Sequence, residues 1–163
     1  MANVYIGIGT NMGDRVSFLG KAMLNIMNDK SLKVKKCSLI YETDAWGKKK
    51  QNKFLNAVIN INTRLGPKNL LKKLKEIEIK AGRTKTEKWS EREIDIDILF
   101  YDDLIYEKDG IMIPHKELHN RNFVLVPLNE IAPDLRHPRM KKKVSKLLKD
   151  SKDKLKVRIY KEK

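Results

Sequence analysis

The sequence predicts an α+β fold in which helices pack on a largely antiparallel sheet. Segments with the two-residue alternation of strands occur beside two long segments with the periodicity of helices. Their order up to Leu104 is βαββαββ, and some neighbouring strands are joined by turns and others by a helix, which favours helices on one face of the sheet. The other face would then be free for ligands. The 163 residues, 40% of them apolar, are expected to form one domain over residues 1–163.

The first half of the chain supplies three strands and a helix. Residues 3–9 predict the first strand, and the segment from about 14 to 27 predicts a helix because its apolar residues recur at helical spacing. Those residues are Val16, Leu19, Met23, Ile26 and Met27. Strands are expected over 34–42 and 54–63, and the loop between them, 43–53, is rich in lysine.

A second helix begins at Pro67, because proline suits the first helical turn, and Gly82 is placed to end it in a left-handed conformation. Its apolar side carries Leu70, Leu71, Leu74 and Ile77. Residues 94–100 alternate as a strand, and 101–104 predict a tight turn into a further short strand.

The last third of the sequence predicts short helices over 117–132 and 142–149 and a last strand over 155–160. It ends in a basic tail over about 150–163. Lys and Arg number 36 against 21 Asp and Glu, a formal charge of +15 that should attract anions such as nucleic acid, phospholipid headgroups or nucleotides. Charge alone does not choose among these, and tracts such as Lys141–Lys143 are usually solvated surface.

Cysteine content and hydropathy indicate the compartment. Cys37 is the only cysteine, which excludes an intramolecular disulfide and a thiolate metal cluster and favours reducing surroundings. The sequence starts without a basic or apolar leader and contains no run of ~20 apolar residues that could span a membrane. We therefore expect a soluble cytoplasmic protein that does not associate with membranes, and a monomer is the default expectation.

Two carboxylates are the central chemical signal. In the strand over 94–100, Ile94, Ile96 and Ile98 would enter the core while Asp95 and Asp97 project together from the other face. Two like charges at this spacing repel unless water or a cation screens them, and Mg²⁺ is commonly held by one or two carboxylates plus substrate phosphates. Alternation alone is equally compatible with an amphipathic strand whose acidic side is solvated.

A basic segment leads directly into this strand. Residues 82–92 carry Arg83, Lys85, Trp89 and Arg92. Taken alone, the segment could be an ordinary surface hairpin. Phosphoryl-type transfer needs metals and fixed cations close together, so beside a carboxylate pair the segment favours a phosphate clamp.

The strand over 54–63 has a core side and a second side. Leu55, Ala57, Ile59 and Ile61 share one parity and are core-like, whereas Phe54 and Asn56 share the other. Phe54 and Asn56 are therefore expected on the sheet face left free for a ligand. Without further context, Asn56 could equally be an ordinary exposed strand residue.

At this point the sequence resembles the 6-hydroxymethyl-7,8-dihydropterin pyrophosphokinases, whose signature is an Arg, two residues, then Asp-aliphatic-Asp. Residues 92–99 match this signature. The likeness covers about residues 3–135 and includes Ile8-Gly9-Thr10-Asn11, Tyr41-Glu42-Thr43, Phe54-Leu55-Asn56-Ala57, Glu78, Gly82-Arg83, Pro114-His115, Asn120-Arg121-Asn122-Phe123 and Glu130-Ile131-Ala132-Pro133.

The resemblance implies a ferredoxin-like sandwich that transfers pyrophosphate from ATP to 6-hydroxymethyl-7,8-dihydropterin in folate biosynthesis. It implies that Asp95 and Asp97 coordinate two Mg²⁺ ions on the ATP phosphates and that Arg83 and Arg92 are catalytic cations. The nucleotide site it implies is formed by Glu78, Lys85, Trp89, the Ile98 backbone, His115 and Arg121. On its own, His115 could be a structural hydrogen-bonding residue.

The same resemblance implies the pterin site. A flat pterin would stack between Phe54 and Phe123, with Asn56, Thr43 and the backbone around Trp46 completing the pocket. An amide and a hydroxyl suit the mixed donors and acceptors of a pterin edge. Phe123 by itself could equally be a core residue.

Two other function classes remain as alternatives. A basic ferredoxin-like sheet bearing aromatic residues could bind single-stranded nucleic acid, but Asp95 and Asp97 would repel its phosphates unless metal were bound. A metal-dependent nuclease would share the two-metal chemistry but has no use for a pterin pocket. We therefore expect ATP and the pterin as small-molecule partners and no nucleic acid.

Overall fold

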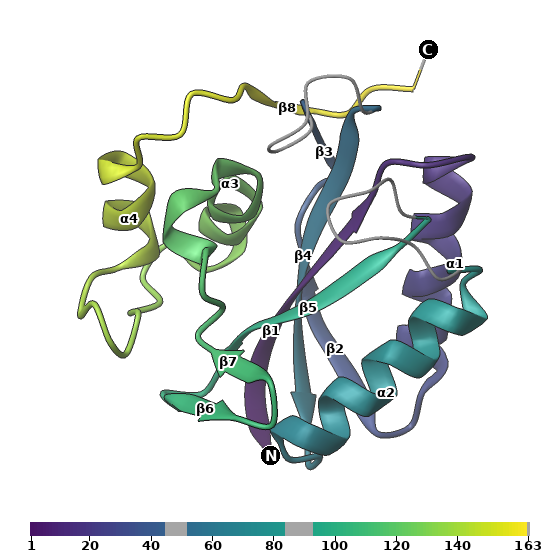
Figure 1. Cartoon of the computed structure of the whole chain (residues 1–163), viewed down its shortest axis with the longest axis horizontal. Coiled ribbons are helices and arrows are strands. Elements are labelled where there is room, and N and C mark those ends of the chain that lie inside the picture. Colours follow the sequence, from purple (N-terminus) through teal and green to yellow (C-terminus); the bar gives the residue numbers. More distant parts are fainter. Residues whose placement is uncertain (45–51, 84–92, 163) are drawn as a thin grey trace.

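The computed structural model describes residues 1–44, 52–83 and 93–162, and in it a six-stranded antiparallel sheet lies between two helical layers (Figure 1). The strand order is β5-β1-β4-β3-β8, and β2 pairs with β4 beside β3. The sheet strands are β1 (Ala2–Thr10), β2 (Leu32–Cys37), β3 (Tyr41–Thr43), β4 (Phe54–Thr63), β5 (Asp95–Tyr101) and β8 (Val157–Ile159). A separate hairpin is formed by β6 (Tyr106–Lys108) and β7 (Ile111–Ile113).

Helices α1 (Arg15–Asn28) and α2 (Pro67–Lys80) cover one face of the sheet, as the periodicity predicts (Figure 1). The Asp14 carboxylate caps α1 by accepting a hydrogen bond from Ser17 N. Gly82 follows α2 with a φ of +109°, the positive value expected for a glycine that ends a helix. The side chains that α1 buries are Leu19, Ala22 and Ile26, whereas Val16 and Met27 are exposed.

This first core takes alternate residues from the central strands. It contains the β-strand residues Val4, Ile6, Ile8, Ile59, Ile61, Ile96 and Ile98, together with Ile94, which precedes β5. Leu70, Leu74 and Ile77 of α2 pack against them. The predicted inward side of the strand over 94–100 is therefore confirmed up to Ile98.

A bulge in β5 reverses the facing of the residues that follow Leu99. The register between β1 and β5 shifts at Tyr5 and Ile6, so that Leu99 is an extra residue on β5. Leu99 and Phe100 both enter a second core on the opposite face of the sheet.

The second core corrects the expectation that this face of the sheet is free. Helices α3 (Asn122–Ile131) and α4 (Val144–Asp150) lie on this side of the sheet (Figure 1). Leu125, Leu128 and Leu147 pack there with Val58 and Phe100. The sequence pattern predicted these helices but not the face that they would cover. Only the part of the face beyond this core is available to a ligand.

The strand predicted over 34–42 is also corrected, because it is two strands. β2 and β3 both pair with β4, and residues 38–40 between them leave the ladder. There Val58 N donates to Ser38 Oγ, and Leu39 N donates to the carboxylate of Glu130 in α3. The break is therefore set by a residue that lies far away in the sequence.

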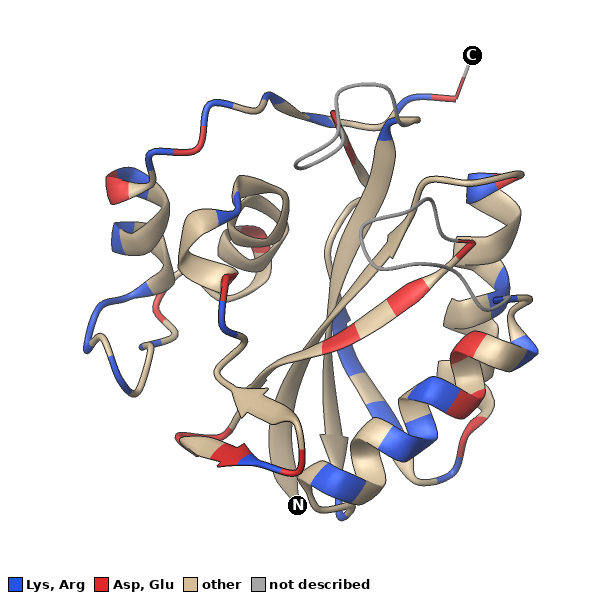
Figure 2. Ribbon diagram, viewed as in Figure 1, with Lys and Arg blue, Asp and Glu red and all other residues tan. Residues whose placement is uncertain are grey.

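The C-terminal third follows the predicted order. A 3₁₀ turn, Leu118–Asn120, precedes α3, and β8 pairs with β3. The basic tail is thus not simply a solvated tract, because β8 joins the sheet. Figure 2 shows basic residues on α2, β2, α4 and this segment, and acidic bands on β5.

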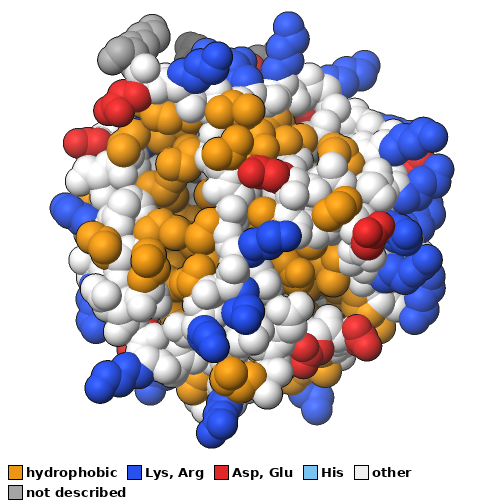
Figure 3. All heavy atoms as spheres, turned by 180° about the vertical axis from the view of Figure 1, so that it is seen from behind, with side chains coloured by type: hydrophobic (Ala, Val, Ile, Leu, Met, Phe, Trp, Pro, Cys, Tyr) orange, Lys and Arg blue, Asp and Glu red, His pale blue; other side chains and the backbone are white. Residues whose placement is uncertain are grey.

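The surface also carries apolar side chains. On the face opposite to that of Figure 1 they gather over the middle, with Lys and Arg along the rim (Figure 3). Exposed large hydrophobic residues include Leu24, Leu39 and Ile159. Among the described residues, no helix is both long and apolar enough to cross a membrane.

The expectation of one domain remains a prediction that the two cores make testable. Leu74→Ala in the first core and Leu128→Ala in the second should each lower the free energy of unfolding by about 2–5 kcal/mol, because each leaves a cavity. If both cores belong to one cooperative unit, urea unfolding followed by circular dichroism will remain a single transition in both variants. An early separate transition in Leu128→Ala would show that the α3–α4 layer unfolds on its own.

Candidate active site

The candidate site lies where four strands place their residues in one row. Opposed residues of an antiparallel pair point to the same face. Asp95 is opposite Gly9, Gly9 is opposite Asn56, and Asn56 is opposite Tyr41. The row therefore runs from the carboxylate on β5, across a residue without a side chain, to an amide on β4.

The neighbouring rows extend this arrangement. Asp97 is opposite Gly7, so both carboxylates adjoin glycines of β1. Thr43 is opposite Phe54, which places Thr43, Phe54 and Asn56 on the same face of the sheet as Asp95. The shared face predicted for Phe54 and Asn56 is confirmed. Gly7 and Gly9, the glycine floor, add no side chain of β1 between the amide and the carboxylates.

Gly9 could not be replaced without disturbing this floor. A Cβ at this position would lie 2.6 Å from Asn56 Oδ1. A Cβ on Gly7 would meet only side-chain atoms of Leu99, at 3.5 Å. The site is therefore tightest at Gly9.

Two polar groups on this face are buried without a hydrogen-bond partner among the residues that the structure describes. They are Thr43 Oγ1 and Asn56 Nδ2, and their residues are 0% and 7% exposed. Such groups cost free energy when they are left unpaired, so native proteins usually supply a partner. Here the partner is expected to be a ligand with both acceptor and donor atoms.

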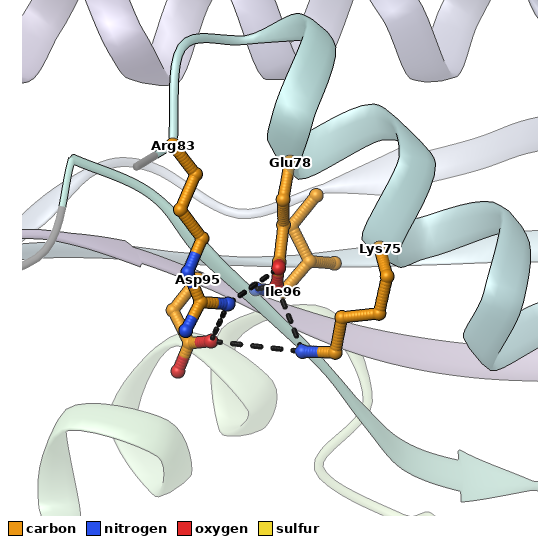
Figure 4. Close-up of polar contacts among 5 residues, drawn as sticks. All are labelled: Lys75, Glu78, Arg83, Asp95 and Ile96. Carbon is orange, nitrogen blue, oxygen red and sulfur yellow. Dashed lines mark hydrogen bonds and ion pairs between the residues drawn. The ribbon is translucent and has the colours of Figure 1, made fainter. Parts of the chain in front are cut away.

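Glu78 organises the carboxylate end of the site (Figure 4). Its side chain is almost fully buried. Glu78 Oε1 accepts hydrogen bonds from Ile96 N at 2.7 Å and Lys75 Nζ at 2.9 Å, and Oε2 accepts one from Arg83 Nη1. Arg83 Nη1 is also 3.3 Å from Asp95 Oδ1, and Lys75 Nζ is 3.8 Å from the same oxygen. Two cations are thus held between a buried carboxylate and a half-buried one.

The charge of Arg83 is secured by its neighbours. Burial works against the charged form, but the carboxylates of Glu78, Asp95 and Asp97 outweigh it and raise the pKa of Arg83. An arginine fixed in this way presents its remaining donors in a defined direction.

His115 and Arg121 approach from the segment between β7 and α3. His115 N donates to Leu99 O, and His115 Nδ1 accepts a hydrogen bond from Glu117 N. Burial, together with the charge of Arg121, lowers the pKa of His115 although Asp95 opposes the shift. The shift favours the neutral ring, and because Nδ1 accepts from Glu117 N, the nitrogen left to donate is Nε2.

Arg121 is also partly buried. Burial lowers its pKa, while Glu117, Asp97 and Asp95 favour its charged form. Its guanidinium carbon lies 5.7 Å from the ring centre of Phe123, at the start of α3. These carboxylates therefore influence both His115 and Arg121.

The structure brings most of the predicted residues to one face, with two qualifications. The Ile98 side chain is in the first core, so the predicted contact can be made only by its backbone. The Glu78 carboxylate is used by protein donors and holds Arg83 in place. The predicted residues Trp46, Lys85, Trp89 and Arg92 lie outside the described part of the chain.

Some residues of the site were missed at the sequence level. Lys75 stands three residues before Glu78 in α2, so the two share a helix face, and this spacing could have identified the pair. Gly7 and Gly9 share one parity in β1, which could have indicated a bare strip. Their position beside Asp95 and Asn56 depends on strand register, which the local pattern does not give.

Comparisons with known proteins agree on one family. The profile of the family described as 7,8-dihydro-6-hydroxymethylpterin-pyrophosphokinase (HPPK) matches residues 5–133. A 2-amino-4-hydroxy-6-hydroxymethyldihydropteridine pyrophosphokinase of Aquifex aeolicus is 44% identical over 138 residues, covering 85% of this chain and 85% of the relative. The Bacillus subtilis protein of the same name is 39% identical over 128 residues, covering 78% and 77%.

A solved structure supports the fold. The HPPK-DHPS protein of Plasmodium falciparum superimposes with a TM-score of 0.69 at 18% identity, over 91% of this chain. This chain spans 43% of that one. At this identity the similarity concerns the fold alone, and it confirms the predicted ferredoxin-like α+β class.

Two histidines predict a loss of stability in acid. Burial is the main cause that lowers the pKa of His115 and of His137, whose Nδ1 accepts hydrogen bonds from Arg139 N and Met140 N. The unfolded chain takes up these protons as the pH falls through about 6.5, before the folded protein does. The free energy of unfolding should therefore decrease as the pH is lowered from neutrality through this value.

Urea denaturation at several pH values between about 5 and 7.5, on either side of the ordinary histidine pKa, measures this effect. His137→Asn should show a shallower decrease than the wild type, because the amide oxygen can accept the same hydrogen bonds without titrating. An unchanged pH dependence in this variant would show that His137 is not one of the responsible groups.

Proposed function

The chain belongs to the 7,8-dihydro-6-hydroxymethylpterin-pyrophosphokinase family, and from this premise we propose that the face carrying Asp95 and Asn56 is its active site. The enzyme transfers pyrophosphate from ATP to 6-hydroxymethyl-7,8-dihydropterin in folate biosynthesis. The observation that carries the assignment is the row from Asp95 through Gly9 to Asn56. This row joins the charged end of the site to the end where Thr43 Oγ1 and Asn56 Nδ2 have no hydrogen-bond partner among the described residues.

The uncharged end suits the pterin. Thr43 Oγ1 and Asn56 Nδ2 offer a hydroxyl and an amide that no described residue satisfies. A pterin edge that pairs with both would remove the cost of leaving them buried. Phe54 lies on the same face and Phe123 at the start of α3, and their rings supply the two stacking surfaces. The Trp46 backbone remains a proposed part of this pocket.

The charged end suits the phosphates of ATP. Glu78 holds Arg83 by a hydrogen bond. Arg121 and His115 lie in the segment between β7 and α3, and His115 can donate through Nε2. Arginine donors match phosphate oxygens, and fixed donors need no reorganisation when charge shifts during transfer. The proposal also includes Arg92 as a second catalytic cation, and Lys85, Trp89 and the Ile98 backbone as nucleotide contacts.

The carboxylate pair fits Mg²⁺ that arrives with ATP. Among the described residues, no group of three or more His, Cys, Asp or Glu side chains forms a ready-made metal site. Asp95 and Asp97 provide two carboxylates on one strand face, and Mg²⁺ is typically held by one or two carboxylates, several waters and substrate phosphates. When bound, two Mg²⁺ ions would act as Lewis acids on the phosphoryl oxygens.

The protein itself then contributes orientation and charge. The hydroxymethyl oxygen of the pterin forms a bond to the β-phosphorus of ATP and loses its proton, and the bond from that phosphorus to the oxygen of AMP breaks. Because Gly7 and Gly9 add no side chain, the two substrates can meet between Asn56 and Asp95. Arg83 and Arg121 stabilise negative charge on the phosphates. Holding both substrates in line accounts for much of the rate.

We also propose that the enzyme is a cytoplasmic monomer that binds no nucleic acid. A single cysteine suits a reducing compartment. The half-buried carboxylate pair on β5 would repel a nucleic-acid backbone, which disfavours that alternative. A nuclease would have no use for the unpaired Thr43 and Asn56 groups.

The first test is turnover and its dependence on Asp97. Incubation with ATP, Mg²⁺ and the hydroxymethyl-dihydropterin should release AMP only when the pterin is present. Asp97→Ala should reduce kcat by about 100-fold or more, because it removes a metal-binding carboxylate without opening the core. Asp103→Ala, at an exposed position in the turn after β5, is the matched control. A near-normal kcat for Asp97→Ala at saturating Mg²⁺ would contradict the metal assignment.

A second test uses the glycine floor. Gly9→Ala should raise the KM for the pterin by about tenfold, because the new Cβ displaces the Asn56 amide and overpacking of this kind commonly costs about 1–3 kcal/mol. Gly7→Ala should have a smaller effect on this KM, since its Cβ meets only the Leu99 side chain. Steady-state kinetics at saturating ATP compares the two. Equal effects would show that contact with Asn56 is not what restricts Gly9.

A further inference from the structure

The segment after α4 runs back across the molecule to the substrate side of the sheet. It leaves α4 at Asp150, passes the start of α3, and ends in β8 beside β3 (Figure 1). All of it lies beyond residue 133, where the family match ends. The segment itself therefore lies outside the part of the chain that matches the family model, although it contacts residues inside that part.

Asp153 binds the first turn of α3. Its Oδ2 accepts a hydrogen bond from Asn122 N at 2.8 Å, and its backbone oxygen accepts one from Asn122 Nδ2 at 3.3 Å. The helix has no acidic residue in its own first turn, and its N-cap residue, Arg121, makes no side-chain capping bond. Asp153 thus supplies from outside the helix the cap that the local sequence lacks.

The orientation of Asp153 is itself fixed. Its Oδ1 accepts a hydrogen bond from Leu155 N at 3.0 Å, and its own N–H donates to Ser151 Oγ. The carboxylate therefore bridges the C-terminal segment and α3, with one oxygen bonded to each.

The same segment is tied to the sheet. Val157 pairs with Thr43, and Tyr160 N donates to Ile40 O at 2.8 Å. The chain from Asp153 to Val157 consequently joins the start of α3, which carries Phe123, to the strand that carries Thr43. Phe123 and Thr43 are both proposed pterin contacts, so this segment links the two elements that carry them.

The other end of α3 has its own attachment to the sheet. Glu130 accepts a hydrogen bond from Tyr41 OH at 2.6 Å and another from Leu39 N at 3.1 Å. Burial, followed by the hydrogen bond to Glu130 and the charge of that carboxylate, raises the pKa of Tyr41 to about 12, so this hydroxyl keeps its proton and remains a donor. Glu130 thus attaches the C-terminal end of α3 to the sheet, and Asp153 attaches the N-terminal end, which carries Arg121 and Phe123.

We propose that Asp153 is a positioning residue for pterin binding, which acts by capping α3 and holding Phe123 at a fixed distance from the Thr43 strand. This inference rests on the proposed function, because it takes Phe123 and Thr43 as pterin contacts. Asp153 touches neither substrate. Because Asp153 holds Phe123 in place before the pterin binds, binding has a lower entropic cost.

The test compares variants of the full-length enzyme in steady-state kinetics and in fluorescence titrations of pterin binding with a nonhydrolysable ATP analogue and Mg²⁺ present. Asp153→Ala should raise the pterin KM and Kd by about five- to tenfold, the factor that corresponds to loss of one helix cap, while kcat at saturation changes less than twofold. Asp153→Asn should give constants between those of the wild type and Asp153→Ala, because its amide oxygen can still cap Asn122 N but its amide nitrogen cannot accept the hydrogen bond from Leu155 N.

Asp134→Ala is the matched control, since this carboxylate is largely exposed and pairs only with Lys143 among the described residues. If Asp153→Ala does not fold, Asp153→Glu displaces the carboxylate by one methylene and should also weaken pterin binding. A variant that melts earlier but binds the pterin as wild type does would overturn the proposal and leave Asp153 with a purely structural role. Failure of the proposed function is distinguishable, because Phe123→Ala would then also leave pterin binding unchanged.

Discussion

The buried carboxylate of Glu78 is the interaction on which the arrangement of the active site depends. An unpaired carboxylate in the interior would be very costly, and here donors from Lys75, Arg83 and the Ile96 backbone satisfy it. The Ile96 bond fixes β5, the edge strand of the sheet, against the end of α2. One side chain therefore sets both the position of the strand that carries Asp95 and the direction of the cation beside it.

How well the sequence predicted the fold depended on the range of the forces involved. β1, β4, α1 and α2 follow from local periodicity and were predicted within a few residues. The split between β2 and β3 depends on Glu130 binding Leu39 N from another layer, so no local pattern could indicate it. The bulge at Leu99 likewise turns two successive apolar residues into the second core, which a strict alternation could not foresee.

The same distinction applies to the site. Asp95 and Asp97 were identified as neighbours because side-chain parity within one strand is a local property. That Thr43 and Asn56 have no partner among the described residues is a property of the packed protein, and the place of Gly9 between amide and carboxylate needs the register of three strands. Residue chemistry could therefore identify these positions, but only the assembled sheet shows that β1 adds no side chain between them.

The two halves of the site are made rigid by different means, and this suits their tasks. The phosphate half is built on α2 and β5, where ion pairs fix Arg83 before any nucleotide binds, so stabilising charge is in place when the transferred group develops its own. The proposed pterin half lies beside α3, which the sheet holds through Tyr41 at one end and the C-terminal segment holds at the other. Because the glycines of β1 add no side chain between the halves, substrates anchored on each side can approach one another directly. In-line transfer requires this freedom at the centre and rigidity at both ends.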